Sequence, residues 1–91
     1  MAKCNTAQLE STIVEIGKNR GTPSKMLPGA YRCSGGWAVA QVMVGPRDTA
    51  QQETWVFQAE GPFWIPQDRA KVCADPPQVP AVLQNEACNS N

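Results

Sequence analysis

Four cysteines in a chain of 91 residues constrain the fold of this protein more than any other feature of its sequence. A chain of this size buries only a modest core, and natural domains below about 80 residues are commonly reinforced by disulfides or metal ions. An even number of cysteines in a short chain favours two disulfides. The sequence therefore predicts one small disulfide-stabilised domain over residues 1–91, held by Cys4, Cys33, Cys73 and Cys88.

The four cysteines can pair in three ways. We favour Cys73–Cys88, which closes a short loop around a run of prolines, together with Cys4–Cys33, which joins the start of a helix to the start of a central strand. The alternative is Cys33–Cys73 with Cys4–Cys88, which would link the sheet to the tail and join the termini. The cysteines are widely separated and the chain has no histidine, so the paired spacing of a structural zinc site is missing. We expect neither a metal nor a cofactor.

Charge and hydropathy limit the possible partners. Eight lysines and arginines balance eight aspartates and glutamates, so the formal net charge is zero at pH 7. Nucleic-acid binding normally needs a basic face, because phosphate contacts dominate the affinity, and we expect no nucleic-acid partner. The longest apolar stretch, Trp37 to Val44, has the length of a strand and falls short of the ~18–20 residues of a transmembrane segment.

The cysteines also indicate the compartment, because disulfides persist in oxidising environments. The chain opens with MAKCN, which lacks the charged and then apolar pattern of an export signal. We expect a secreted or extracytoplasmic protein whose signal peptide has been removed. A cytosolic chain, and a removed lipoprotein signal or other anchor near Cys4, are the alternatives.

Apolar residues recur at helical spacing near the start of the chain, at Leu9, Ile13 and Ile16. They predict a helix over Asn5–Gly17, in which the first asparagine caps the N-terminus and the last glycine takes the left-handed position after the C-terminus. The β-branched residues of Thr12–Ile16 leave a short strand as the alternative.

Three strands are predicted after a connection over Lys18–Gly29, which is rich in glycine and proline. Tyr31–Val44 has the clearest strand pattern, and Glu53–Glu60 follows as its antiparallel partner after a polar loop. Phe63–Ile65 begins a third, short strand, which Pro66 confines to an edge because proline cannot donate to a ladder.

The central strand offers a face of small apolar side chains, which suits close packing under a helix: Ala38, Ala40, Val42 and Val44. Beyond the sheet, the prolines of Asp75–Pro80 predict an ordered extended loop, and Ala81–Ala87 a short helix held by Cys88. Asn89 to Asn91 are expected to fray. The expected fold is α+β, with an N-terminal helix packed on a three-stranded antiparallel sheet and a disulfide-tethered C-terminal loop or short helix.

The stretch RCSGGWAVAQV contains Ser34 followed by Gly35-Gly36, which looks like the serine surround of a chymotrypsin-type protease. A serine nucleophile needs a base, usually histidine, and the chain has none. No lysine has a spacing that supports a serine–lysine pair. We therefore interpret the two glycines as a bend or bulge at the entry to a strand.

Paired carboxylates are the remaining catalytic option. Glu53 and Glu60 bracket one predicted strand and Asp48 lies in a loop, so nothing requires two carboxyl groups to face each other across a cleft. The sequence predicts no enzyme activity.

The aromatic residues are the candidate binding residues, because all of them fall on the predicted sheet: Tyr31, Trp37, Trp55, Phe57, Phe63 and Trp64. In one interpretation they form the core, since large aromatics dominate small cores. In the other, Trp37, Trp55 and Trp64 cluster on one exposed face, with Tyr31 nearby, as a platform for a sugar ring or a partner protein. Asp75 and Pro77 of the extended loop complete the candidate binding residues.

A set of motifs over residues 30–91 resembles small exported cysteine-containing domains of actinobacteria. The resemblance is carried by Cys33-Ser34-Gly35-Gly36-Trp37-Ala38-Val39-Ala40, Trp55-Val56-Phe57, Gly61 with Phe63-Trp64, Cys73, Val79-Pro80 and Ala87-Cys88-Asn89. These domains occur as secreted proteins, lipoproteins or tails of membrane-anchored proteins. The resemblance implies an extracytoplasmic location in the cell envelope and no known catalytic residues, and Cys4 is its least typical part.

Two functions are compatible with these features. The first is a non-catalytic extracytoplasmic binding module that engages another protein or a cell-envelope glycan through the aromatic sheet face and the proline-rich loop. The second is a small inhibitor of a secreted enzyme, in which Gly45–Gln52 or Asp75–Pro80 is inserted into the target cleft, because a rigid loop lowers the ordering cost of binding. The ligand and the oligomeric state are left open.

Overall fold

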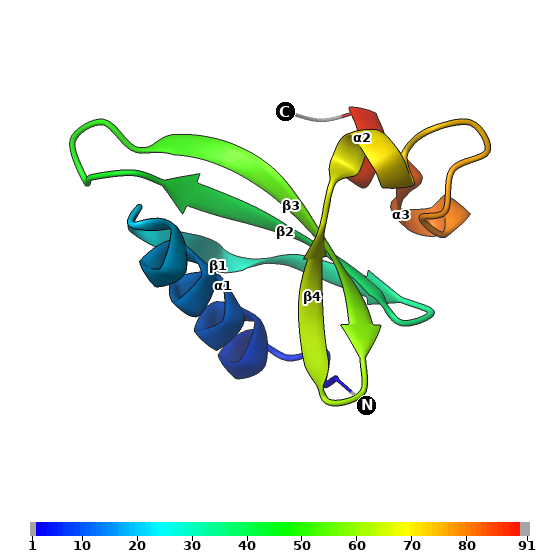
Figure 1. The fold of residues 1–91 in the computed structure, drawn as a ribbon, viewed down its shortest axis with the longest axis horizontal. Helices are drawn as coiled ribbons and strands as arrows, with labels where there is room; N and C mark the ends of the chain where they lie inside the picture. The colour runs from blue at the N-terminus through cyan, green and yellow to red at the C-terminus, as the bar shows by residue number, and fades with distance from the viewer. Residues whose placement is uncertain (1, 90–91) are drawn as a thin grey trace.

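The computed structural model describes residues 2–89 and has an α+β architecture with an N-terminal helix and an antiparallel sheet (Figure 1). The elements, in chain order, are α1 Thr6–Arg20, β1 Ser24–Ser34, β2 Trp37–Val44, β3 Gln51–Glu60, β4 Phe63–Gln67, α2 Arg69–Val72 and α3 Ala81–Asn89. The strands pair in the order β1-β2-β3-β4, each antiparallel to the next. The sequence predicted that Asn89 to Asn91 would fray. Asn89 is instead the last residue of α3, and residues 90–91 lie outside the described residues.

The sheet has four strands, so the predicted three-stranded sheet is wrong by one strand. The predicted strand Tyr31–Val44 is two strands of a hairpin, with Ser34 paired to Trp37 across Gly35-Gly36. Both glycines have positive φ, 55° and 83°, the condition that a two-residue hairpin turn of this kind requires. The two glycines therefore reverse the chain, where the sequence predicted a bend or bulge.

The first half of β1 lies in the segment predicted as a connection. Its pairing with β2 shifts between Met26 and Tyr31, around Pro28-Gly29, and the glycine has φ 66°. An irregularity of this kind bends a strand and interrupts the two-residue alternation by which strands are found in a sequence. Because of this proline and glycine, the sequence predicted a connection where β1 pairs with β2 on both sides of them.

Helix α1 confirms the predicted helix over the strand alternative, and extends it. Asn5 caps the N-terminus through its side-chain oxygen, which accepts from the Gln8 N–H at 2.8 Å. The helix ends at Gly21, whose φ is 71°, and the prediction of Gly17 as the C-terminal glycine is wrong. Gly17 is buried inside the helix, where an added Cβ would lie 2.7 Å from the Thr22 carbonyl oxygen. This glycine allows α1 to approach the start of β1 closely.

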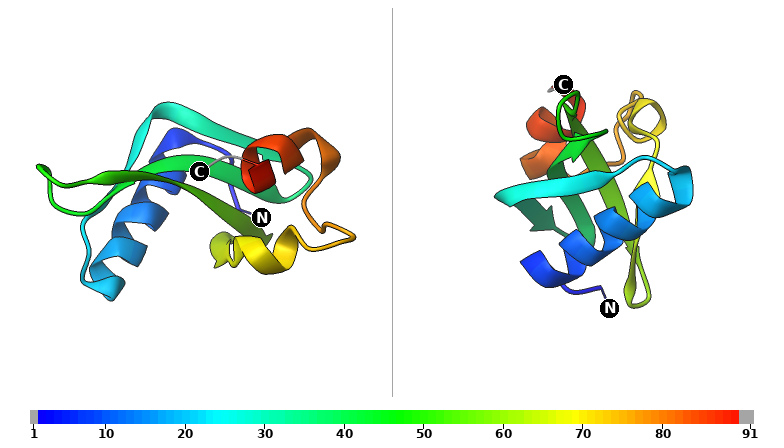
Figure 2. Two further views of the ribbon diagram at one scale, coloured as in Figure 1. Left: turned by 90° about the horizontal axis from the view of Figure 1, so that it is seen from above. Right: turned by 90° about the vertical axis from the view of Figure 1, so that its left-hand side faces the viewer.

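Helices α1 and α3 lie on opposite faces of the sheet (Figure 2). Each face carries its own hydrophobic cluster. On one face α1 places Leu9 and Ile13 against the small side chains of β2, as predicted. On the other face α3 places Leu83 and Ala87 against the alternate positions of β2 and β3. The α1-side cluster is Leu9, Ile13, Met26, Ala38, Ala40, Val42, Phe57 and Trp64, and the α3-side cluster is Trp37, Val39, Val56, Val72, Val79, Leu83 and Ala87.

Both predicted disulfides are confirmed. Cys4–Cys33 joins the segment before α1 to β1, and Cys73–Cys88 joins the residue that ends α2 to α3. Each disulfide packs beside a different cluster, because Cys33 contacts the α1-side cluster while Cys73 and Cys88 contact the α3-side cluster. None of the helices within residues 2–89 has the length and apolar character needed to cross a bilayer.

Candidate binding pocket

A pocket forms where β4 ends before its neighbour does. The last pair between the two strands is Val56 with Gln67, whereas β3 begins five residues earlier, at Gln51. The chain turns away from the sheet into α2 after Gln67. The space beside β3 is a pocket of about 330 Å³, called here the Trp55 pocket, and the residues that line it include Arg20, Glu53, Trp55, Pro66, Gln67 and Arg69.

Trp55 is the aromatic wall of this pocket, and its ring is held by three kinds of contact. It packs partly against the α1-side cluster, and its ring centroid lies 6.3 Å from that of Phe57, with the planes tilted by 58°. Its indole N–H donates to a Glu53 carboxylate oxygen at 3.0 Å. An aromatic ring fixed in this way loses little conformational freedom when a ligand binds.

Arg20, the last residue of α1, covers the Trp55 ring with its Cζ 5.4 Å from the ring centroid. Such a cation–π contact contributes about 0.5–1 kcal/mol at an exposed site, and a positive charge is also favourable at a helix C-terminus. Within residues 2–89 the guanidinium of Arg20 makes no ion pair and no hydrogen bond. Its N–H donors are therefore oriented by the ring beneath them and remain available to a ligand.

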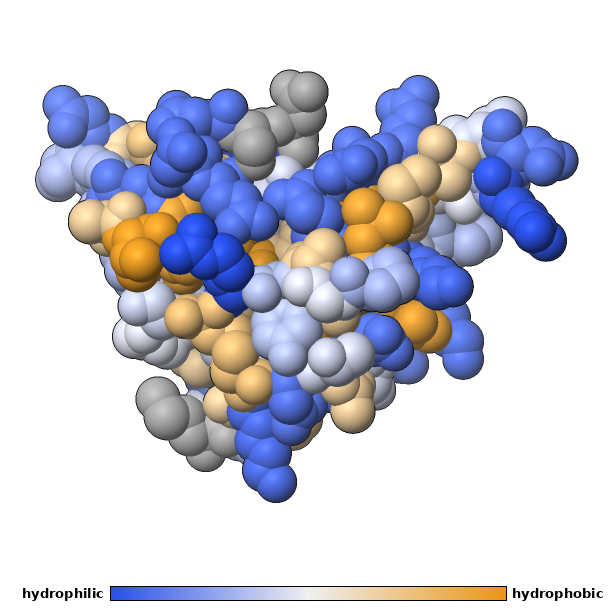
Figure 3. All heavy atoms as spheres, turned by 180° about the vertical axis from the view of Figure 1, so that it is seen from behind, coloured by the Kyte–Doolittle hydropathy of each residue, from blue (hydrophilic) through white to orange (hydrophobic). Residues whose placement is uncertain are grey.

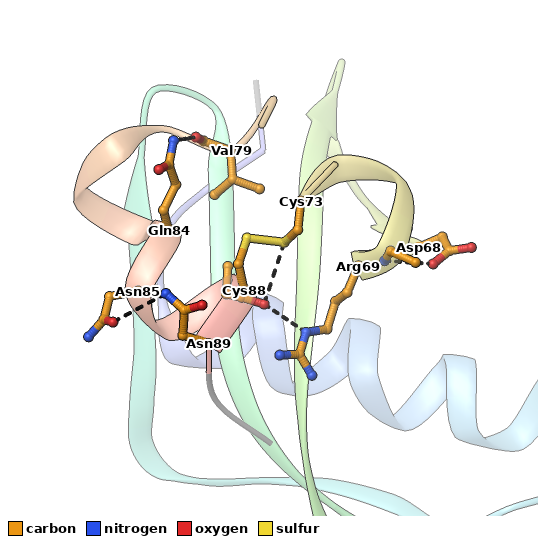
Figure 4. Close-up of a disulfide and its surroundings, with 10 residues drawn as sticks. Asp68, Arg69, Cys73, Val79, Gln84, Asn85, Cys88 and Asn89 are labelled. Atoms are coloured by element: carbon orange, nitrogen blue, oxygen red, sulfur yellow. Dashed lines mark hydrogen bonds between the residues drawn. A yellow bond between two sulfur atoms is a disulfide. The ribbon is translucent and has the colours of Figure 1, made fainter. Parts of the chain in front are cut away.

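Arg69 contributes the second arginine of the pocket, but it also has a structural role. Its Nε donates to the Ala87 carbonyl oxygen at 2.7 Å, which ties α2 to α3 beside the Cys73–Cys88 disulfide (Figure 4). Asp68 caps α2, since its carboxylate accepts from the Ala70 N–H at 2.9 Å. These bonds fix Arg69, which lines the Trp55 pocket together with Arg20.

The three tryptophans do not form the cluster that one interpretation of the sequence expected. Trp37 is 7% exposed and belongs to the α3-side cluster, whereas Trp64 is 4% exposed and belongs to the α1-side cluster. The Trp64 indole N–H donates to the Lys3 carbonyl oxygen at 2.9 Å. An exposed platform built from all three is therefore excluded, and of the three only Trp55 is half-buried and lines a pocket.

The other candidate binding residues lie in different settings, although Tyr31 packs against the α1-side cluster that also contains Trp64. Tyr31 is half-buried and its hydroxyl accepts from the Thr6 hydroxyl at 3.3 Å, so it helps to hold α1 on the sheet. Asp75 and Pro77 are exposed in the loop between α2 and α3. Ser34 is half-buried at the end of β1, directly before the hairpin turn.

Sequence reasoning missed both arginines of the pocket. Arg20 ends a helix and Arg69 begins one, and each is far from Trp55 along the chain. Arg20 and Arg69 approach Trp55 only because α1 and α2 pack around β3. No pattern of spacing in the sequence predicts such an approach. The visible signal was the basic last turn of α1, which also contains Lys18.

The loop between α2 and α3 is closed at its base. The Gln78 N–H donates to the Val72 carbonyl oxygen at 2.8 Å, and Val79, only 1% exposed, anchors the next residue in the α3-side cluster. The Gln84 side chain donates to the Val79 carbonyl oxygen at 2.8 Å, next to the Cys73–Cys88 disulfide (Figure 4). The five residues of 74–78 are exposed above this base.

The large hydrophobic residues at the surface come from different elements of the fold. On the face opposite to that of Figure 1 they form separate spots between hydrophilic residues (Figure 3). The large hydrophobic side chains that are exposed within residues 2–89 are Val14, Phe63 and Val82.

Comparison with protein-family models, with curated proteins and with solved structures finds no match for this chain.

Proposed function

We propose that this protein is a non-catalytic extracytoplasmic binding module that holds a carboxylate of a partner protein in the Trp55 pocket. The observation that carries the proposal is the arrangement of Arg20, whose guanidinium lies on the Trp55 ring without an ion pair within residues 2–89. A guanidinium presents planar donors that match a carboxylate, and a guanidinium already held in place loses less freedom on binding.

A protein partner is favoured over a cell-envelope glycan by the same contact. A sugar ring stacks on the open face of an aromatic side chain, and here Arg20 covers the Trp55 ring while the indole packs against the core. A sugar would have to displace the guanidinium from the ring. A carboxylate would instead bind the guanidinium where it lies.

The extracytoplasmic location is supported by the two disulfides, which are typical of oxidising compartments. The resemblance of residues 30–91 to small exported domains of actinobacteria supports the same location. The absence of histidine from the sequence, and of any spacing that pairs two carboxylates, supports a binding role over an enzymatic one.

The test is a titration followed by the NMR signal of the Trp55 indole N–H, which a Trp55→Phe variant identifies among the three tryptophans. The probes are the blocked peptide Gly-Gly-Glu-Gly-Gly, the same peptide with Gln in place of Glu, and an N-acetylhexosamine. The Glu peptide is expected to shift the signal. Arg20→Gln should weaken this binding about tenfold or more, because a hydrogen bond to a charged group contributes about 1.5–3 kcal/mol.

The matched control is Lys71→Gln, which removes the same charge from an exposed position on α2 that does not line the pocket. It should leave the titration unchanged. A Trp55 signal that responds to the sugar and ignores the Glu peptide would show that the partner is a glycan and that the proposal is wrong.

An inhibitor of a secreted enzyme is the second candidate, and the closed base of the 74–78 loop favours it. The disulfide, the Gln78–Val72 hydrogen bond and the buried Val79 hold both ends of an exposed segment that contains Asp75 and Pro77. A loop held in this way could enter a cleft at little entropic cost.

This candidate predicts that the protein inhibits a member of a panel of secreted proteases and lysozymes. Pro77→Ala with Asp75→Ala should then weaken the inhibition, while Arg20→Gln should not. Inhibition that depends on Arg20 would show that the enzyme contacts the Trp55 pocket and not the 74–78 loop. If no enzyme of the panel is inhibited, the result counts against this candidate.

A further inference from the structure

The end of α1, the start of β1 and the turn of the β2–β3 hairpin lie at one end of the molecule (Figures 1 and 2). A second concave surface lies among these elements. It consists of two pockets, of about 660 and 370 Å³, that share Pro23 and Ser24 as walls. The first extends along the base of the hairpin loop and the second along the last turns of α1. We call the two together the basic groove.

Three cationic side chains line the basic groove: Lys18 from α1, Lys25 from β1 and Arg47 from the hairpin loop. All three are exposed, and within residues 2–89 none of them makes an ion pair or a hydrogen bond. The residues that line the two pockets include no aspartate or glutamate. A chain of zero net charge therefore concentrates positive charge in one groove.

Nonpolar residues line the same two pockets as these cations. Val14, which is 43% exposed, lines the pocket beside α1, and Met43 lines the pocket beside the hairpin. Pro23 is part of both pockets. A groove lined by both nonpolar side chains and cations matches a ligand that carries both apolar and acidic groups.

The walls of the basic groove are fixed by backbone contacts. The Gly45 N–H donates to the Pro23 carbonyl oxygen at 2.8 Å, which ties the hairpin to the start of β1. The Thr22 N–H donates to the Gly17 carbonyl oxygen at 2.9 Å, where the absence of a side chain lets α1 contact Ser24 closely. The groove is thus a preformed surface, which lowers the cost of binding.

We propose that the basic groove binds an extended acidic segment of a partner protein, with carboxylates at Lys18, Lys25 and Arg47 and apolar side chains on Val14 and Met43. The argument is charge complementarity, which steers partners together and selects among them. The nonpolar residues in the lining favour a peptide over a nucleic acid, whose binding rests on phosphate contacts to a continuous basic face. This surface is separate from the Trp55 pocket and does not depend on it.

The experiment measures binding of a fluorescent blocked heptapeptide of alternating Glu and Val by anisotropy at low salt. The wild-type protein should bind it, and the peptide with Gln in place of every Glu should not bind. Lys25→Glu with Arg47→Glu should weaken binding more than about tenfold, because two attractions become repulsions. Added salt should weaken binding by the wild-type protein, since the paired charges are exposed.

The matched control is Lys3→Glu with Lys71→Glu, which changes the net charge equally through two exposed lysines outside the groove. It should keep most of the affinity. Equal losses in the two double variants would show that net charge alone drives binding and would overturn the proposal.

Two further results would also overturn it. An oligonucleotide of the same charge that competes as well as the peptide would mean that the groove binds polyanions in general. Loss of binding in Arg20→Gln would place the peptide in the Trp55 pocket. Retained binding in Arg20→Gln, together with loss in the groove variant, would place the peptide in the basic groove and outside the Trp55 pocket.

Discussion

Phe57→Ala is expected to lower the free energy of unfolding by about 3–5 kcal/mol, the usual cost of truncating a buried phenylalanine. Phe57 is fully buried in the centre of β3, in the cluster that α1 covers with Leu9 and Ile13. The truncation would leave a cavity that neither the sheet nor the disulfide-anchored helix can close easily. Native proteins are stabilised by only about 5–15 kcal/mol in total, so this substitution should remove a large share of the stability.

Denaturant unfolding followed by far-UV circular dichroism measures this change, and the chain supplies its own control. Phe63→Ala removes the same atoms from a side chain that is 65% exposed in the β3–β4 hairpin. It should change the stability by less than about 0.5 kcal/mol. Similar costs for the two variants would contradict the assignment of Phe57 to the core.

Removal of the Cys4–Cys33 disulfide by Cys4→Ala with Cys33→Ala is expected to cost about 3.5 kcal/mol. The bond spans a sequence separation of 29 residues, and in the chain-entropy model it stabilises by limiting the unfolded chain. The corresponding removal of Cys73–Cys88, with a separation of 15, should cost about 3 kcal/mol. The two variants should therefore rank in this order in denaturant unfolding.

A thiol count is the control for both variants. Alkylation under denaturing and non-reducing conditions, followed by intact mass, should find no reactive thiol in the wild-type protein or in either double variant. Reactive thiols in wild-type protein from a host that forms disulfides would contradict the pairing. They would also remove the main support for an extracytoplasmic location.

The sequence correctly predicted the features that depend on residues close together in the chain. The spacing of Leu9 and Ile13 placed them under one face of a helix, and Asn5 capped that helix as expected. The small residues of β2 lie against this helix, because alternate side chains of a strand share a face. The disulfide pairing followed from which elements each cysteine adjoins.

Other parts of the fold depend on contacts that no local pattern encodes. Strand β1 contains Pro28-Gly29 near its middle and so has the composition of a loop there, yet pairing with β2 on both sides maintains the strand. The sequence established which side chains alternate within each strand, but the face that each strand turns toward α1 depends on the register between strands. Trp37 and Trp64 therefore lie on opposite faces, although both were candidates for one cluster.

The candidate site was predictable only in part. Trp55 was named from its residue type and its place in a strand, but its exposure depends on where β4 ends. The arginine that covers it comes from the far end of α1, at a position that the predicted helix did not reach. The basic groove likewise combines cations from α1, β1 and the hairpin loop, and all three cations lie in segments that the sequence predicted as a connection or a loop.

Strand β2 has a consequence for how this sequence can change over time. Its even-numbered positions from Ala38 serve the core beneath α1, and its odd-numbered positions from Trp37 serve the core beneath α3. Deletion or insertion of one residue would exchange the two sets, because side chains alternate with a period of two. The indole of Trp37 would then face α1, where alanines leave no space for it. We therefore expect β2 to tolerate substitutions that preserve side-chain volume and not to tolerate insertions or deletions.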